Sequence, residues 1–159
     1  MVNIFRKISN TLSFRKLKKN YDYNFFVEDQ NNKFKLLGFN RKQALEKLSI
    51  IKKKYDFLDR KMSTEHETLL SALSYKMDMP KIEILEIGTY DGANSFLLSL
   101  LFQNPNITTI DLPDDNEEFI KTYERQKDLN KFIKKRDEIL SNVKNIKFVK
   151  TNPINLIKS

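Results

Sequence analysis

Residues 81–112 read KIEILEIGTYDGANSFLLSLLFQNPNITTIDL, and this stretch decides the fold. Its first part, 82–87, is a short apolar run that predicts a strand covered on both faces. A turn follows that contains two of the three glycines of the chain, Gly88 and Gly92. An apolar strand that leads directly into a glycine turn indicates the start of an α/β unit.

The rest of the stretch predicts a helix over about 93–102 and a second strand over 107–110, which ends on Asp111. This length is typical of a βαβ crossover, which is right-handed and makes its two strands parallel. Parallel strands end at the same edge of the sheet, where open α/β sheets bind their ligands. We therefore expect residues 88–94 and Asp111 to lie side by side and to face one ligand.

The residues around this turn favour a ligand other than a dinucleotide. Tyr90 stands where the second glycine of a Gly-x-Gly-x-x-Gly turn would lie, which disfavours a nicotinamide-dependent dehydrogenase, and no Walker loop follows. Glu86 offers a carboxylate to an ammonium group or a cation, and Asp111 offers two acceptors to the vicinal hydroxyls of a ribose. A ligand with an amino-acid end and a nucleoside end would satisfy both side chains.

Residues 86–94 (EIGTYDGAN) and 110–112 (IDL) resemble the first and second motifs of the class I S-adenosylmethionine-dependent methyltransferases. The first motif has the form also seen in catechol and caffeoyl-CoA-type O-methyltransferases. The resemblance implies a Rossmann-like three-layer α/β fold, with S-adenosyl-L-methionine as the cofactor. It places Glu86 near the ammonium group of the cofactor, Asp111 on its ribose hydroxyls and Leu112 against its adenine.

The same resemblance implies roles for further residues. Gly88 and Gly92 let the backbone approach the methionine part of the cofactor, and Asn94 touches its carboxylate region. Asn152 follows a third strand predicted over 146–149 and matches a position near the adenine amino group. The complete predicted set of cofactor-binding residues is Glu86, Gly88, Thr89, Tyr90, Gly92, Asn94, Asp111, Leu112 and Asn152.

His66 is the only histidine of the chain and the candidate catalytic residue. It falls in the first turn of a helix that begins near residues 62–67, where Thr64 and Glu67 have the spacing of a capping box. In the methyltransferases that this chain resembles, the segment before the first strand often covers the cofactor or reaches the acceptor, so His66 could serve as a general base. Polar residues in a first helical turn are more often exposed without a chemical role, and the sequence leaves both interpretations open.

The composition excludes several classes of site. The chain has 159 residues, enough for one ordinary domain, and it has no cysteine, which excludes disulfides and thiolate metal sites. A single histidine excludes a multi-histidine cluster, so we predict no metal. No run of about 18 apolar residues predicts a membrane-spanning helix, and no signal-peptide core is present, which favours the cytoplasm.

The net charge of +8 is concentrated at the N-terminus, because residues 1–20 carry six basic residues and no acid. The remainder is nearly neutral, so we expect no nucleic-acid partner. The arm mixes apolar and basic residues. This pattern fits peripheral contact with an anionic membrane as an amphipathic helix, and it also fits a solvated tail.

The sequence predicts two segments. Residues 1–61 comprise the basic arm, an aromatic hairpin of two short strands within 21–39, and a helix that begins after Asn40. Residues 62–159 form a partial S-adenosylmethionine-binding domain, whose later part contains a long helix over about 117–140. The polar middle of this helix, 124–128, leaves open a bend or a surface overhang.

The predicted function is methyl transfer from S-adenosylmethionine to a small-molecule or glycan-like acceptor, with O-methylation favoured. Only the first three strands of a methyltransferase sheet can be found, so we expect either a truncated fragment or a partner chain that completes the sheet. An apolar strand left at a sheet edge also favours aggregation. The alternative function is that of a non-catalytic half-domain that binds a nucleoside or a partner chain.

Overall fold

The computed structural model describes residues 22–59, 65–77, 79–121 and 127–157, and the predicted basic arm lies outside these ranges. Contacts divide the chain into two compact units, 1–41 and 42–159. The predicted boundary lay after residue 61. In the structure, the helix that follows Asn40 belongs almost entirely to the second unit, with the sheet.

The first unit contains helix α2, Tyr23–Leu36, where the sequence predicted a hairpin within 21–39. This prediction was wrong, because the ends of the segment carry helix caps. The Asp22 carboxylate accepts two backbone N–H groups of the first turn, at 2.9 and 3.2 Å. Gly38 has a φ of +72°, and the N–H groups of Gly38 and Phe39 each donate to carbonyls of the last turn at 2.8 Å. These paired bonds form a Schellman cap, and they end a helix rather than a strand.

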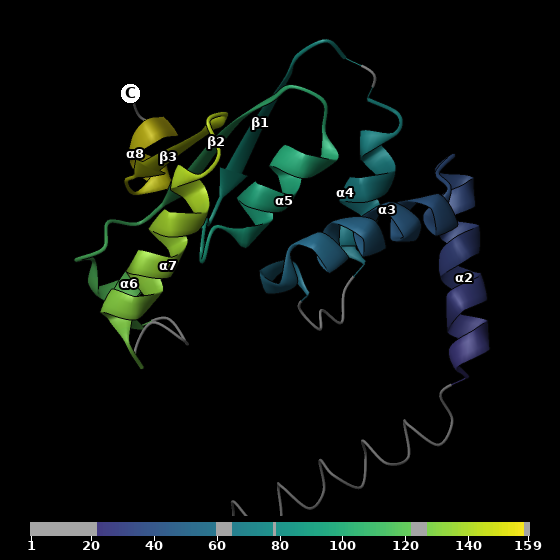
Figure 1. Cartoon of the computed structure of the whole chain (residues 1–159), viewed down its shortest axis with the longest axis horizontal. Coiled ribbons are helices and arrows are strands. Elements are labelled where there is room, and N and C mark those ends of the chain that lie inside the picture. The colour runs from purple at the N-terminus through teal and green to yellow at the C-terminus, as the bar shows by residue number, and fades with distance from the viewer. Residues whose placement is uncertain (1–21, 60–64, 78, 122–126, 158–159) are drawn as a thin grey trace, which may run out of the picture. The chain divides into compact units, whose positions relative to one another are not determined.

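The second unit is a mixed α/β structure built on three parallel strands, as predicted (Figure 1). The strands are β1 (Ile82–Ile87), β2 (Pro105–Asp111) and β3 (Ile146–Lys150), in the order β1-β2-β3. Helix α5, Ala93–Leu101, connects β1 to β2 and begins where the sequence predicted it. The arrangement is compatible with a Rossmann-like fold, and it brings the carboxyl ends of β1 and β2 to the same edge.

One face of the sheet packs against helix α5, which in turn contacts helix α7, Leu129–Ser141 (Figure 1). The buried side chains of α5 lie against the central strand, where Ile107 is fully buried. They form one core with residues of the neighbouring elements. This core includes Leu48, Leu58, Ile82, Ala93, Phe96, Leu97, Leu98, Leu101, Phe102, Ile107 and Ile139.

Helices α3 (Arg41–Lys54) and α4 (His66–Ser74) support α5 through a shared lysine. The Lys47 ammonium donates to the carbonyl of Leu101, the last residue of α5, at 2.7 Å and to the Ser74 hydroxyl at 2.8 Å. A cation at a helix C-terminus satisfies carbonyls that have no partner within the helix. Burial lowers the pKa of Lys47. This contact holds α4, and with it His66, beside α5.

The opposite face of the sheet is open at β1, whereas Ile110 of β2 is buried there, and its lining mixes apolar and polar side chains. Leu85 and Ile87 point away from α5, and each is 64% exposed. The prediction that strand 82–87 is covered on both faces was therefore wrong, because only its face toward α5 is covered in the described residues. Among the described strands, β1 is paired on one side only. A shallow hollow of about 470 Å³ covers this face, and it is lined by Glu83, Ile84, Leu85, Ile87, Thr108, Ile110 and Pro153. Pro153 begins helix α8, Pro153–Ile157, as predicted.

The region predicted as one long helix over 117–140 contains two helices, and the chain is not helical at 127–128, within the polar stretch where the sequence left a bend open. Helix α6 covers Glu117–Lys121, and α7 begins after Asp128, whose carboxylate accepts the N–H of Lys131 at 3.1 Å. An N-cap at this point starts a new helix instead of continuing an old one. A single 3₁₀ turn, Asp56–Leu58, follows α3. None of the helices in the described part of the chain has both the length and the apolar character needed to cross a bilayer.

Candidate functional site

The turn after β1 has an unusual backbone at the carboxyl edge of the sheet. Gly88, Tyr90 and Gly92 have φ values of +92°, +51° and +77°. Side-chain-bearing residues rarely adopt this region, so the turn depends on its glycines. The Gly88 N–H donates to the carbonyl of Ile110 at 2.8 Å, which fastens the start of the turn to β2.

The two glycines of the turn face different surroundings. A β-carbon added at Gly88 would meet no atom within 4 Å, so this position opens into free space. A β-carbon added at Gly92 would lie 3.0 Å from the Leu140 side chain of α7. Gly88 therefore leaves room for a ligand to approach the backbone, whereas Gly92 leaves room for a helix.

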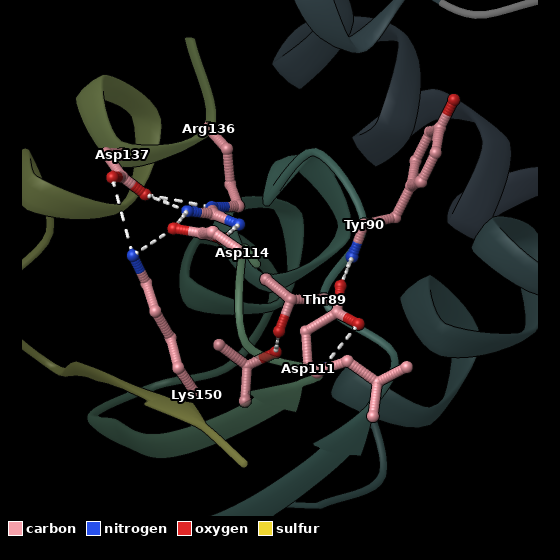
Figure 2. A network of polar contacts seen from close by, with 9 residues as sticks. Thr89, Tyr90, Asp111, Asp114, Arg136, Asp137 and Lys150 are labelled. Carbon is pink, nitrogen blue, oxygen red and sulfur yellow. Dashed lines mark hydrogen bonds and ion pairs between the residues drawn. The ribbon is translucent and has the colours of Figure 1, made fainter. Parts of the chain in front are cut away.

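Asp111, at the end of β2, is hydrogen-bonded to the glycine turn. Its carboxylate accepts the Tyr90 N–H at 3.0 Å and the Leu112 N–H at 2.9 Å, and the residue is only 8% exposed (Figure 2). The structure thus brings Asp111 and the glycine turn together, as the crossover argument predicted. Leu112 is half-buried beside them.

Glu86 is the centre of a polar network beneath the turn. Its carboxylate accepts from the Asn94 amide at 2.6 Å, from the Thr109 hydroxyl at 2.6 Å, and from the Ser95 hydroxyl. Because Thr109 donates its only hydroxyl hydrogen to Glu86, the Thr89 hydroxyl must donate to Thr109, at 2.7 Å. Burying these hydroxyls requires such partners. Glu86 therefore joins β1, β2 and the start of α5, in addition to any contact with a ligand.

His66 and Asn94 line one hollow between α4 and α5. Its volume is about 410 Å³, and its walls are mostly apolar. Both His66 and Asn94 are exposed, and the Asn94 amide also donates to the Glu86 carboxylate. The full lining is Leu58, His66, Glu67, Leu69, Leu70, Ala93 and Asn94. The candidate base predicted from the sequence therefore lies close to one end of the glycine turn.

Two predicted residues have local structural roles. Thr89 is buried, with 2% exposure, so its side chain faces the network around Glu86 rather than solvent. The Asn152 carboxamide accepts the Ile154 N–H at 3.0 Å and caps α8.

Thr64 of the predicted capping box lies outside the described residues.

A group of charged side chains ties α7 to the ends of β2 and β3 (Figure 2). Arg136 of α7 is fully buried and donates to both carboxylate oxygens of Asp114, at 2.7 and 3.2 Å. It also donates to Asp137 at 2.8 Å, and Lys150 contacts Asp114 at 2.6 Å. We call these four residues the Arg136 clamp. Burial alone would lower the pKa of Arg136, but the two carboxylates raise it above its ordinary value.

The clamp was not predicted from the sequence, although a signal for it is present. Phe132, Arg136 and Leu140 recur at four-residue steps, so an arginine lies on the apolar face of a helix. A guanidinium is rarely buried unless it is paired, and the pattern therefore indicates a buried ion pair.

The clamp predicts how stability depends on pH. Burial alone would raise the pKa of Asp114, but the hydrogen bonds and charges of Arg136 and Lys150 hold it below its ordinary value. A carboxyl with a depressed folded-state pKa stabilises the fold above its unfolded pKa, about 3.9, and loses this contribution as pH falls through the folded value. We expect the free energy of unfolding in urea to fall below pH 4 more steeply in the wild type than in Asp114→Asn. Parallel pH profiles for the two proteins would contradict this expectation.

No protein-family model matches this sequence, and no curated protein gives a significant match. Within the described residues, no three His, Asp or Glu side chains gather in a group that could hold a metal ion. The edge formed by β1, β2 and α5 is therefore the feature from which we infer the function.

Proposed function

We propose that this chain binds S-adenosylmethionine at the carboxyl edge of β1 and β2 and transfers its methyl group to a small-molecule or glycan-like acceptor, with a hydroxyl acceptor favoured. One observation carries the proposal. Gly88 presents an unobstructed backbone at the same edge where Asp111 is bonded to the glycine turn. This combination suits a ligand that joins an amino acid to a nucleoside.

The surroundings of the turn fit this cofactor. A β-carbon at Gly88 would occupy the open space that a ligand needs in order to approach the backbone. The residues that would hold the cofactor are Asn94 and the Gly88 backbone at the methionine end, and Asp111 and Leu112 at the nucleoside end. The fixed network around Glu86 keeps these elements in place before any ligand arrives.

When bound, the cofactor would supply an activated methyl group, whose in-line transfer to the acceptor oxygen breaks its bond to sulfur and releases S-adenosylhomocysteine. The work of the protein is then mainly to orient the acceptor and to exclude water. The hollow between α4 and α5 has apolar walls and carries His66, which would accept the proton of an acceptor hydroxyl. No other histidine is present in the sequence for this role.

Binding should depend strongly on Asp111. We expect Asp111→Ala to weaken S-adenosylhomocysteine binding by about 1–3 kcal/mol, because charge-assisted hydrogen bonds to the ribose would be lost. Titration calorimetry measures this directly, and Asp115→Ala is the matched control, since Asp115 is exposed in the following loop. An unchanged dissociation constant in folded Asp111→Ala would remove Asp111 from the site. Binding of NAD in place of S-adenosylhomocysteine would favour a dehydrogenase.

A second candidate function, a non-catalytic binding half-domain, is favoured by the open face of the sheet. Leu85 and Ile87 are exposed on β1, an edge strand that is paired on one side only among the described residues. Such a surface suits contact with another chain. Binding of S-adenosylhomocysteine without methyl transfer to any acceptor would support this function over catalysis.

A further inference from the structure

Helix α7 contacts both halves of the proposed cofactor site, although no sequence motif lies in it. At the turn, the centre of the Phe132 ring lies 5.2 Å from the centre of the Tyr90 ring. At the nucleoside end, Arg136 binds Asp114, which lies in the loop that begins after Asp111. The same helix therefore contacts both halves of the proposed site.

The contact between Arg136 and Asp114 is rigid. Two parallel N–H···O bonds fix the position and the plane of the Asp114 carboxylate. The guanidinium is itself held by Asp137 and lies 4.7 Å from the centre of the Phe148 ring on β3. A planar group held on several sides has little freedom to move with the loop. Asp114 can shift only if its two bonds to the buried guanidinium break.

We infer that Arg136 is a positioning residue for the nucleoside end of the cofactor. Through Asp114 it fixes the loop 112–116, and it thereby holds Asp111 and Leu112 at a set separation from the glycine turn. The inference rests on the proposed function, because it concerns the same site. It adds a residue on α7, far along the chain from both motifs, that controls affinity without touching the ligand.

A purely structural role for Arg136 would have a different consequence. It would lower the stability of a variant but leave the affinity of its folded molecules unchanged. A positioning role changes the affinity itself. It should do so equally for S-adenosylhomocysteine and for methylthioadenosine, which lacks the amino-acid end and so reports only on the nucleoside side.

The test uses the full chain and calorimetry with both ligands. We expect Asp114→Asn to raise both dissociation constants about tenfold, as is typical for residues coupled within one network. Asp114→Glu keeps the charge and both acceptor oxygens, so it should restore most of the affinity. Lys134→Met is the control, because it removes an exposed charge from α7 outside the clamp. Amide hydrogen exchange of Leu112 and of residues 114–116 should be faster in Asp114→Asn than in the wild type, in Asp114→Glu and in Lys134→Met.

The outcomes separate the two proposals. Unchanged dissociation constants in folded Asp114→Asn would overturn the positioning role and leave the proposed function standing. A wild-type protein that binds neither ligand would overturn both. If Asp114→Asn does not fold, Arg136→Lys takes its place, since lysine keeps the charge and loses the two-pronged geometry. A raised dissociation constant in that variant supports the inference, and an unchanged one overturns it.

Discussion

Replacing Gly88 by valine should abolish S-adenosylhomocysteine binding in a protein that still folds. The added side chain would project into the open space beside the turn, where its β-carbon would meet no atom within 4 Å. The φ of +92° adds strain of about 1–2 kcal/mol for a residue with a β-carbon. A small domain usually tolerates a loss of this size. The substitution should therefore reduce the affinity for S-adenosylhomocysteine much more than the stability of the fold.

Calorimetry with S-adenosylhomocysteine, together with a urea melt of the same sample, tests this prediction. Gly88→Ala is the matched control, because it also places a β-carbon at this positive φ but adds less bulk and less strain than the β-branched valine. We expect Gly88→Ala to bind more weakly than the wild type but better than Gly88→Val. Near-normal binding by folded Gly88→Val would mean that the turn is only a structural connection.

The sheet could be predicted from the sequence because its signals are local and agree with one another. The apolar run 82–87 favours a strand whose Ile82 and Ile84 join the core, and the glycines after it permit the sharp turn into α5. The end of the second strand at Asp111 then follows from the crossover length. Each of these features depends on residues close together in the sequence, so the local pattern was sufficient to predict the strands and the turn between them.

The helix α2 was missed because aromatic residues were given more weight than caps. Aromatic side chains favour strands only when a pleated surface is present to pack them. Here Asp22 and Gly38 satisfy the end groups of a helix, and these bonds decide the local structure. Capping residues at both ends of a segment are stronger evidence than the composition between them.

The Arg136 clamp was missed for a different reason. Its members come from three elements, and only the fold brings Asp114, Arg136 and Lys150 together. The spacing of Phe132, Arg136 and Leu140 indicates a buried arginine, but no spacing along the chain identifies the carboxylates that pair with it. The roles of the two glycines could not be separated either, because the contact of Gly92 with Leu140 depends on where α7 lies.

Gly92→Val should destabilise the fold, in contrast to the expected effect at Gly88. The φ of +77° disfavours any residue with a β-carbon, and that β-carbon would lie 3.0 Å from two atoms of the Leu140 side chain. Backbone strain and overpacking together should lower the free energy of unfolding by about 2–5 kcal/mol. Urea unfolding measures this loss.

A milder pair of substitutions measures the contribution of the contact between residue 92 and Leu140. Gly92→Ala should cost less in a Leu140→Ala background than in the wild type, because the shortened side chain leaves room for the new β-carbon. The φ strain remains in both backgrounds, so the relief should be partial. An equal cost in the two backgrounds would show that Leu140 is not the obstacle. Folded Gly92→Ala should retain more affinity for S-adenosylhomocysteine than Gly88→Val, because its β-carbon faces the helix and not the open side of the turn.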